Sequence, residues 1–122
     1  KTMPHPTDIR LHRASRVLEV AFDDGSRFKL PCEYLRVYSP SAEVRGHGPG
    51  QEVLQVGKET VNITAIEPVG NYAVKLYFDD GHNTGLYSWD WLYKLGTEQD
   101  ARWRDYLAQL AKAGYQRTAP AS

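Results

Sequence analysis

The sequence predicts an α+β domain: an antiparallel β-sheet built from hairpins, a short helix near residues 31–37, and an amphipathic C-terminal helix near residues 98–113 that packs on the sheet. Three observations support this fold class. Segments with alternating apolar and polar residues recur along the chain, the turn sequence Phe-Asp-Asp-Gly occurs twice, and an apolar stripe with helical spacing lies near the C-terminus. Because the strands come first and the main helix last, the order is that of an α+β domain.

Six short strands are expected, mostly joined as hairpins. In both copies of Phe-Asp-Asp-Gly, at residues 22–25 and 78–81, the glycine supplies the positive φ that a tight hairpin turn requires. The neighbouring aspartates are therefore interpreted as turn residues and not as an acid and base pair. The expected strands cover residues 9–15, 16–22, 26–31, 59–70 and 73–78, and a last strand returns toward Trp89.

Two helices interrupt this pattern. The first follows Pro31, which a first helical turn tolerates because no N–H is needed there. The second is expected to begin after Thr97 as its N-cap and to end before Gly114. Its apolar residues have the spacing of one helical stripe: Trp103, Tyr106, Leu107, Leu110 and Ala111. A glycine-rich loop is expected over residues 46–57, and long loops of this kind are often functional.

The length of 122 residues is that of one domain, expected over residues 8–114 with flexible ends at 1–7 and 115–122. Fifteen basic residues balance fifteen acidic ones, so no net charge draws the chain to nucleic acid or to an anionic membrane. No apolar run approaches the roughly 20 residues of a spanning helix. With one cysteine and no leader-like apolar stretch, the expected location is the cytoplasm.

The residues of common catalytic motifs are missing. Neither the Gly-x-Ser-x-Gly turn of a hydrolase nor a phosphate-binding P-loop occurs, and the four histidines are scattered. Cys32 is interpreted as a small, buried and inert thiol. The sequence therefore predicts that the chain is not an enzyme.

Four short segments carry a resemblance to a known family: Leu35-Arg36, Ser39-Pro40-Ser41-Ala42, Asp80-Gly81-His82 and Tyr87-Ser88-Trp89. Over residues 8–112 the chain resembles the gamma-butyrobetaine hydroxylase-like N-terminal domain family, a small domain of unknown function. The resemblance implies attachment to larger proteins in relatives, among them dioxygenases and P-loop carriers linked to iron–sulfur cluster assembly.

In the dioxygenase relatives, the resemblance implies a zinc ion held by three cysteines and a histidine. The cysteine positions correspond to Ser39, Ser41 and Val44, and the histidine position to His82. A serine hydroxyl is a poor zinc ligand and valine offers none, so we expect a metal-free fold without a cofactor. His82 is then expected to hydrogen-bond near the Ser39–Ser41 turn; the other reading is that it still serves an exposed site with Ser39, Ser41 and Arg36.

Three hypotheses of function follow. The first is a non-catalytic accessory or interaction module with an unknown protein partner, whose surface is expected to contain Arg36, Ser39, Ser41, Arg45, His47 and Trp89. The second is a metal-binding protein, for zinc or iron, that uses His82, Cys32 or His47 in iron–sulfur cluster assembly or beside a carnitine-type dioxygenase. The third is a small enzyme for a cationic metabolite, which Tyr87 and Trp89 would cage with their rings.

Overall fold

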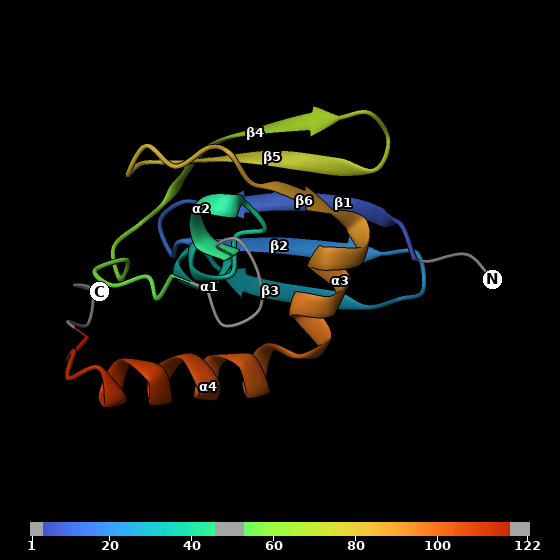
Figure 1. Cartoon of the computed structure of the whole chain (residues 1–122). Helices are drawn as coiled ribbons and strands as arrows, with labels where there is room; N and C mark the ends of the chain where they lie inside the picture. The colour runs from blue at the N-terminus through green and yellow to red at the C-terminus, as the bar shows by residue number, and fades with distance from the viewer. Residues whose placement is uncertain (1–3, 46–52, 118–122) are drawn as a thin grey trace.

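The computed structural model describes residues 4–45 and 53–117 and confirms the α+β fold (Figure 1). Within these residues, none of the helices has the length and apolar character that crossing a membrane requires. The elements are β1 (Pro6–His12), β2 (Val17–Phe22), β3 (Arg27–Pro31), α1 (Cys32–Val37), α2 (Ala42–Arg45), β4 (Ile63–Val69), β5 (Ala73–Phe78), β6 (Leu86–Ser88), α3 (Trp89–Thr97) and α4 (Gln99–Lys112).

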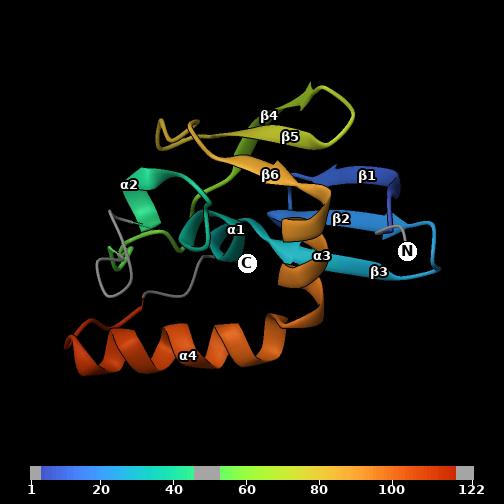
Figure 2. The ribbon, with the colours of Figure 1, turned by 45° about the vertical axis from the view of Figure 1, so that its right-hand side comes forward.

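The strands form two sheets, whereas the sequence predicted one. Each sheet is antiparallel and three-stranded, with the orders β1-β2-β3 and β4-β5-β6. In two views of the ribbon, the β4–β6 sheet and helix α4 lie at opposite ends of the molecule, with the β1–β3 sheet between them (Figures 1 and 2). One apolar core joins the two sheets and α3, and it includes Leu18, Val20, Phe22, Leu30, Ile63, Val74, Leu76, Phe78, Leu92 and Leu95.

The two sheets repeat one arrangement of three strands followed by a helix. In each half the first strand has a register shift near its start, opposite Phe22 or Phe78. A threonine hydroxyl beside each shift donates to a carbonyl of the middle strand, from Thr7 at 3.3 Å and from Thr64 at 3.2 Å. Helix α1 begins directly after β3, and α3 begins directly after β6.

Both Phe-Asp-Asp-Gly sequences form the hairpin turns that were predicted. Gly25 and Gly81 have φ values of 90° and 91°, and each donates its N–H to the carbonyl of the phenylalanine, at 3.1 Å in both turns. The repeated sequence therefore marks where the chain turns around. The two turns still differ in what their second aspartate contacts: Asp24 accepts the hydroxyl of Tyr93, whereas Asp80 belongs to the candidate site.

The C-terminal region contains two helices where one was predicted. Ser88 caps α3, because its Oγ accepts the N–H of Trp91 at 3.2 Å, so the strand expected to reach Trp89 ends one residue earlier. Thr97 was wrongly predicted as the N-cap of the next helix. It is the last residue of α3, and its hydroxyl donates to the carbonyl of Lys94. Glu98 occupies the N-cap of α4, where its side chain makes no capping bond to the main chain.

Helix α4 covers nearly the predicted range, and Gly114 follows it with a φ of 79°. Its buried residues, Tyr106 and Leu110, pack against Val37 of α1, and the helix that lies on the first sheet is α3. Leu107 and Ala111, predicted in the buried stripe, are exposed. The stripe is narrower than predicted because α4 faces a short helix and not a sheet.

The structure describes a few residues on both sides of the predicted domain, 4–7 and 115–117. Strand β1 begins at Pro6, and the side chains of Tyr115 and Arg117 bond to Glu59 and Glu33. Residues 46–52 of the expected glycine-rich loop lie outside the described residues, and residues 53–62 contain neither helix nor strand. The four-residue helix α2 was not predicted.

Four tyrosine hydroxyl groups join elements that are distant in sequence. Each donates to a main-chain carbonyl oxygen: Tyr34 to Leu95 at 2.7 Å, Tyr38 to Arg102 at 2.8 Å, Tyr87 to Leu35 at 2.5 Å and Tyr106 to Gln55 at 2.6 Å. Burial raises the pKa of the Tyr34, Tyr87 and Tyr106 hydroxyls, so they stay protonated donors. Tyr87 links the second sheet to α1 in this way.

We predict that Tyr87→Phe lowers the free energy of unfolding by about 1–3 kcal/mol, because the buried carbonyl oxygen of Leu35 loses its donor. Urea unfolding measures the change. The matched control is Tyr77→Phe, whose hydroxyl donates to Glu67 in an exposed position, and it should stay within about 0.5 kcal/mol of the parent. Equal effects of the two substitutions would show that the Tyr87 bond is not a significant link.

Candidate functional site

The candidate site is a buried cluster of Ser39, Ser41 and His82. The Oγ of Ser39 lies 2.8 Å from Nε2 of His82, and the Oγ of Ser41 lies 3.4 Å from the same nitrogen. Ser39 Oγ also accepts the N–H of Ser41 at 3.3 Å. All three residues are buried. The structure thus brings together three of the four positions at which the resemblance implied zinc ligands.

The main chain on both sides fixes this cluster. Tyr38 is the C-cap of α1, and α2 begins just after Ser41, whose carbonyl accepts the N–H groups of Val44 and Arg45 at 3.1 and 3.0 Å. On the other side, the carbonyl of His82 accepts the N–H of Phe78 at 3.0 Å within the second hairpin turn. The turn therefore presents the imidazole to the Ser39–Ser41 segment.

Gly85 allows the two segments to come this close. A Cβ atom at this position would lie 2.4 Å from Ser39 Oγ and 3.2 Å from Cδ of Pro40. Any larger residue would have to displace the serine hydroxyl from His82. The glycine is thus a requirement of the cluster.

Asp80 forms the charged edge of the site. Its Oδ2 accepts Nε of Arg36 and Nζ of Lys58, both at 2.9 Å, and its Oδ1 accepts the N–H of His82 at 3.1 Å. Burial alone would raise the pKa of Asp80, but Lys58, the His82 N–H and Arg36 outweigh this effect and lower the pKa to about 2. The carboxylate is therefore ionised at neutral pH.

The Ser39–His82 distance matches that of a nucleophile and its base, but the surroundings do not suit catalysis. Ser39 is only 1% exposed, and its hydroxyl oxygen already receives the Ser41 N–H. A substrate carbonyl would have to reach this oxygen through the packed interior. The arrangement supports a structural hydrogen bond.

The residues of this cluster do not fit a zinc ion. One imidazole and two neutral hydroxyls are a weak donor set, and the fourth position, Val44, is a buried apolar side chain. Within residues 4–45 and 53–117, no three His, Cys, Asp or Glu residues are grouped closely enough to hold a metal. The zinc site of the relatives is thus not retained in these residues.

Cys32 and His47 were the other candidate metal ligands. Cys32 is buried, its Sγ lies 3.7 Å from Oδ1 of Asn62, and burial raises the pKa of the thiol to about 11. The burial predicted for Cys32 is confirmed, and a neutral thiol of this kind is a poor metal ligand and nucleophile. His47 lies outside the described residues.

Three of the six residues expected in the interaction surface are buried in the structure. Arg36, Ser39 and Ser41 are buried, and Arg36 is bound to Asp80 and Gln55, so these side chains do not face a partner. Arg45 is exposed, and Trp89 is half-buried with its Nε1 donating to the carbonyl of Asn71 at 2.8 Å. Tyr87, expected beside Trp89 in a cage for a cation, is fully buried. A ring cage built on these two residues is therefore closed to a metabolite.

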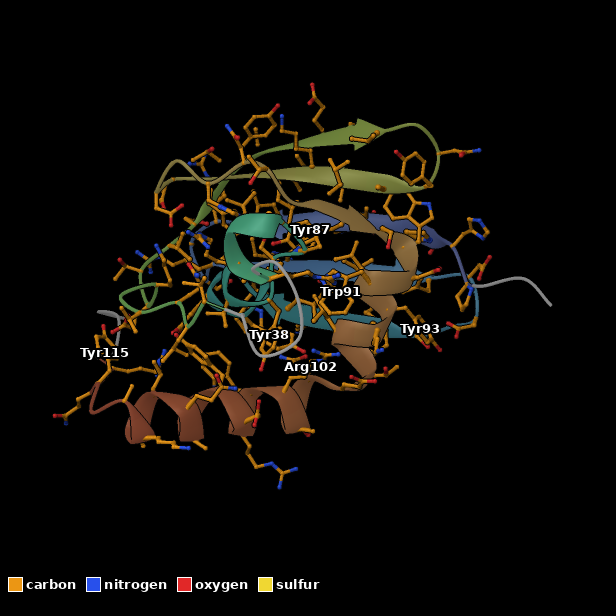
Figure 3. The ribbon with its side chains drawn as sticks, viewed as in Figure 1. Tyr38, Tyr87, Trp91, Tyr93, Arg102 and Tyr115 are labelled. Carbon is orange, nitrogen blue, oxygen red and sulfur yellow. The ribbon has the colours of Figure 1, made fainter. Side chains whose placement is uncertain are left out.

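Sequence reasoning missed a stack of cations and rings next to the cluster. The guanidinium groups of Arg45 and Arg102 lie 4.8 and 5.0 Å from the ring centroid of Trp91, and Arg102 lies 5.3 Å from the ring of Tyr38. Figure 3 shows Tyr38, Trp91 and Arg102 gathered between α3 and α4. The members come from α1, α2, α3 and α4 or their ends, so no local sequence pattern could indicate the stack.

We predict that the stability of the protein falls as the pH drops from about 4 to 2, in part because Asp80 becomes protonated. The folded-state pKa of Asp80 is lowered, so its contribution is complete above its unfolded pKa of 3.8 and is lost as the pH falls through about 2. Because Asp80 lies in an exposed turn, solvent screening reduces the contribution that this lowering implies to about 1 kcal/mol. Asp80→Asn should lose about this much at pH 7, measured by urea unfolding.

The control for this experiment is Glu19→Gln. Hydrogen bonds from Arg27 and His12 lower the pKa of Glu19 to about 2, so this half-buried carboxylate titrates in the same pH range. Asp80→Asn should therefore reduce the pH dependence of the free energy of unfolding only in part, because Glu19 still titrates. Glu19→Gln should leave the part that comes from Asp80 unchanged. A pH profile of Asp80→Asn parallel to that of the parent would contradict the role given to Asp80.

Comparison with known proteins identifies a family. Residues 9–93 match the family described as gamma-butyrobetaine hydroxylase-like, N-terminal, which leaves α4 outside the match. No protein with a curated description matches the chain.

Three solved structures are similar over most of the chain. Two are NMR solution structures. The first is 55% identical with a TM-score of 0.84, and the match covers 100% of this chain and 91% of the other. The second is 50% identical with a TM-score of 0.83, and the match covers 99% of this chain and 95% of the other. The third is the crystal structure of a protein of unknown function in the DUF971 family from Acidithiobacillus ferrooxidans, 41% identical with a TM-score of 0.64, covering 75% and 92%. On the match over residues 9–93, this chain belongs to the gamma-butyrobetaine hydroxylase-like N-terminal domain family.

Proposed function

We propose that this chain is a non-catalytic accessory module that binds a protein partner, and that a hydrogen-bonded cluster has replaced the zinc site implied by the family resemblance. The observation that carries the proposal is the 2.8 Å contact between Ser39 and His82 in the closed interior. It joins the same two segments that a zinc ion would join. The cluster therefore serves the structural part of the metal's role and leaves no position open for chemistry.

The energetics of the fold support a metal-free domain. A structural zinc contributes on the order of 10 kcal/mol in small fingers, comparable with the whole stability of about 5–15 kcal/mol of a typical domain. In this chain the segments around the cluster are also tied by Asp80, by the Tyr87 hydroxyl and by a core that spans both sheets. These contacts are available to offset the loss of metal coordination.

Two points support the accessory role: the nucleophile types of the site are closed to solvent, and related domains are attached to larger proteins. Ser39, Ser41 and Cys32 are nucleophile types, but all three are buried and hydrogen-bonded. The resemblance implies that related domains are attached to larger proteins. A site whose described nucleophile types are all closed to solvent contributes to such an assembly through contacts.

The metal-free state is tested by comparing this chain with the triple variant Ser39→Cys, Ser41→Cys and Val44→Cys. We expect that EDTA shifts the Tm of the parent by less than about 1 °C, whereas the variant takes up one zinc ion and EDTA lowers its Tm. Metal analysis by mass spectrometry gives the zinc and iron content of both proteins.

The control is the triple variant that also carries His82→Ala, which should bind zinc more weakly because the fourth ligand is missing. A parent protein that contains stoichiometric zinc or iron, loses it in His82→Ala and melts with EDTA would instead establish the metal-binding hypothesis. Failure of the triple variant to bind zinc would show that the four positions no longer converge.

The interaction role is tested by affinity purification of the tagged chain from its native cells. We expect one protein to be recovered in a near-stoichiometric ratio, because a module without its own reaction works through a partner. Quantitative mass spectrometry of the eluate measures the ratio, and a tagged unrelated domain of similar size is the control. Recovery of no partner, combined with turnover of a defined substrate, would contradict the proposal.

A further inference from the structure

The chain turns back after α4 (Figures 1 and 2). Tyr115 and Arg117 of this segment bind two buried carboxylates. The hydroxyl of Tyr115 donates to Oε2 of Glu59 at 2.9 Å, and the guanidinium of Arg117 binds both carboxylate oxygens of Glu33, with Nε at 2.9 Å from Oε2. Glu33 and Glu59 are each only 7% exposed. Figure 3 shows Tyr115 beyond the C-terminal end of α4.

The surroundings of Arg117 are selective for a guanidinium group. Two parallel N–H bonds to one carboxylate need the planar fork of arginine, which a lysine ammonium does not have. The Cζ of Arg117 also lies 5.3 Å from the ring centroid of Trp103, and this ring is held by Tyr106 at 5.3 Å. We call Glu33, Glu59, Trp103 and Tyr106 the guanidinium site.

The carboxylates and the cation belong to different parts of the chain. Glu33 lies on α1 and Glu59 on the segment before β4, both inside the family match over residues 9–93. Trp103, Tyr106 and Arg117 lie beyond that match. Arg117 is 27% exposed and is attached only through the short segment after α4. The residues matched by the family thus supply the two carboxylates, and the segment that follows the match supplies the bound arginine.

We propose that the guanidinium site is a docking point for an arginine side chain of a partner protein, and that Arg117 is a tethered ligand that the partner's arginine displaces. The inference rests on the proposed function, because it names the chemistry by which the module would recognise its partner.

Displacement by another arginine avoids the main energetic obstacle at this site. Removing Arg117 alone would leave the buried Glu33 carboxylate without a counter-ion, which is strongly unfavourable. When one guanidinium replaces another, the carboxylate stays paired and the ring of Trp103 stays covered. The tether gives Arg117 an effective concentration on the order of millimolar, so a partner must add contacts outside the site to compete.

The test uses the full-length chain with Arg117→Ala and the probe peptide acetyl-Tyr-Gln-Arg-amide, which copies residues 115–117. Addition of the peptide to ¹⁵N-labelled variant should shift the indole N–H signal of Trp103 in a saturable way. The parent protein should bind at least about tenfold more weakly, because its own Arg117 occupies the site. An equal response of the parent and the variant would overturn the tethered-ligand role.

Two controls test the chemistry of recognition. The same peptide with lysine or citrulline in place of arginine should bind at least about fivefold more weakly, since neither side chain provides a charged fork. The double variant Glu33→Gln and Arg117→Ala should not respond. Equal binding of the three peptides, or a response that survives Glu33→Gln, would overturn the proposal. Arg117→Gln serves as a second variant, and the dispersion of amide signals verifies that each protein is folded.

The outcome separates this inference from the proposed function. If Arg117→Ala does not bind the arginine peptide, the guanidinium-site proposal is wrong, but the proposal of a metal-free accessory module is unaffected. If the parent protein requires metal or turns over a substrate, the accessory-module proposal is wrong, but arginine binding by Arg117→Ala would still support the guanidinium site.

Discussion

The carboxylate of Asp80 connects three parts of the chain: α1 through Arg36, the segment before β4 through Lys58, and its own hairpin turn through the N–H of His82. Both cations are largely buried, so their charges need this partner. Because the same turn carries the imidazole that meets Ser39, the position of the candidate site depends on the Asp80 contacts. A residue of a hairpin turn thus holds three separate segments of the chain together through its carboxylate.

Local sequence patterns predicted those parts of the fold that local physics decides. The Phe-Asp-Asp-Gly turns were predicted because glycine tolerates positive φ, and the range of α4 because its apolar residues have helical spacing. Helix α3 was missed, since Trp89, Trp91 and Tyr93 have side chains that favour strands, whereas in the structure Ser88 caps a helix that buries Leu92 and Leu95. The division into two sheets depends on which strands pair, which alternation does not encode.

The candidate site was only partly predictable for a related reason. The resemblance placed Ser39, Ser41 and His82 together, but the burial of Arg36 follows from Asp80 and Gln55, which are 44 and 19 residues away. Glu33 and Arg117 are separated by 84 residues and carry no motif. Pairs of this kind become visible only when the fold is known, because any acidic and basic residue of the sequence could form them.

The repetition of one sheet-and-helix arrangement has a consequence for how the protein folds. Each sheet is assembled from neighbours in sequence, so closing its hairpins costs little loop entropy and should be an early event. Neither half, however, has an interior of its own: Leu18 and Phe22 belong to the same cluster as Ile63 and Phe78. The hairpins can therefore form separately, but they become stable only when the halves meet, and the chain should fold and unfold as one cooperative unit.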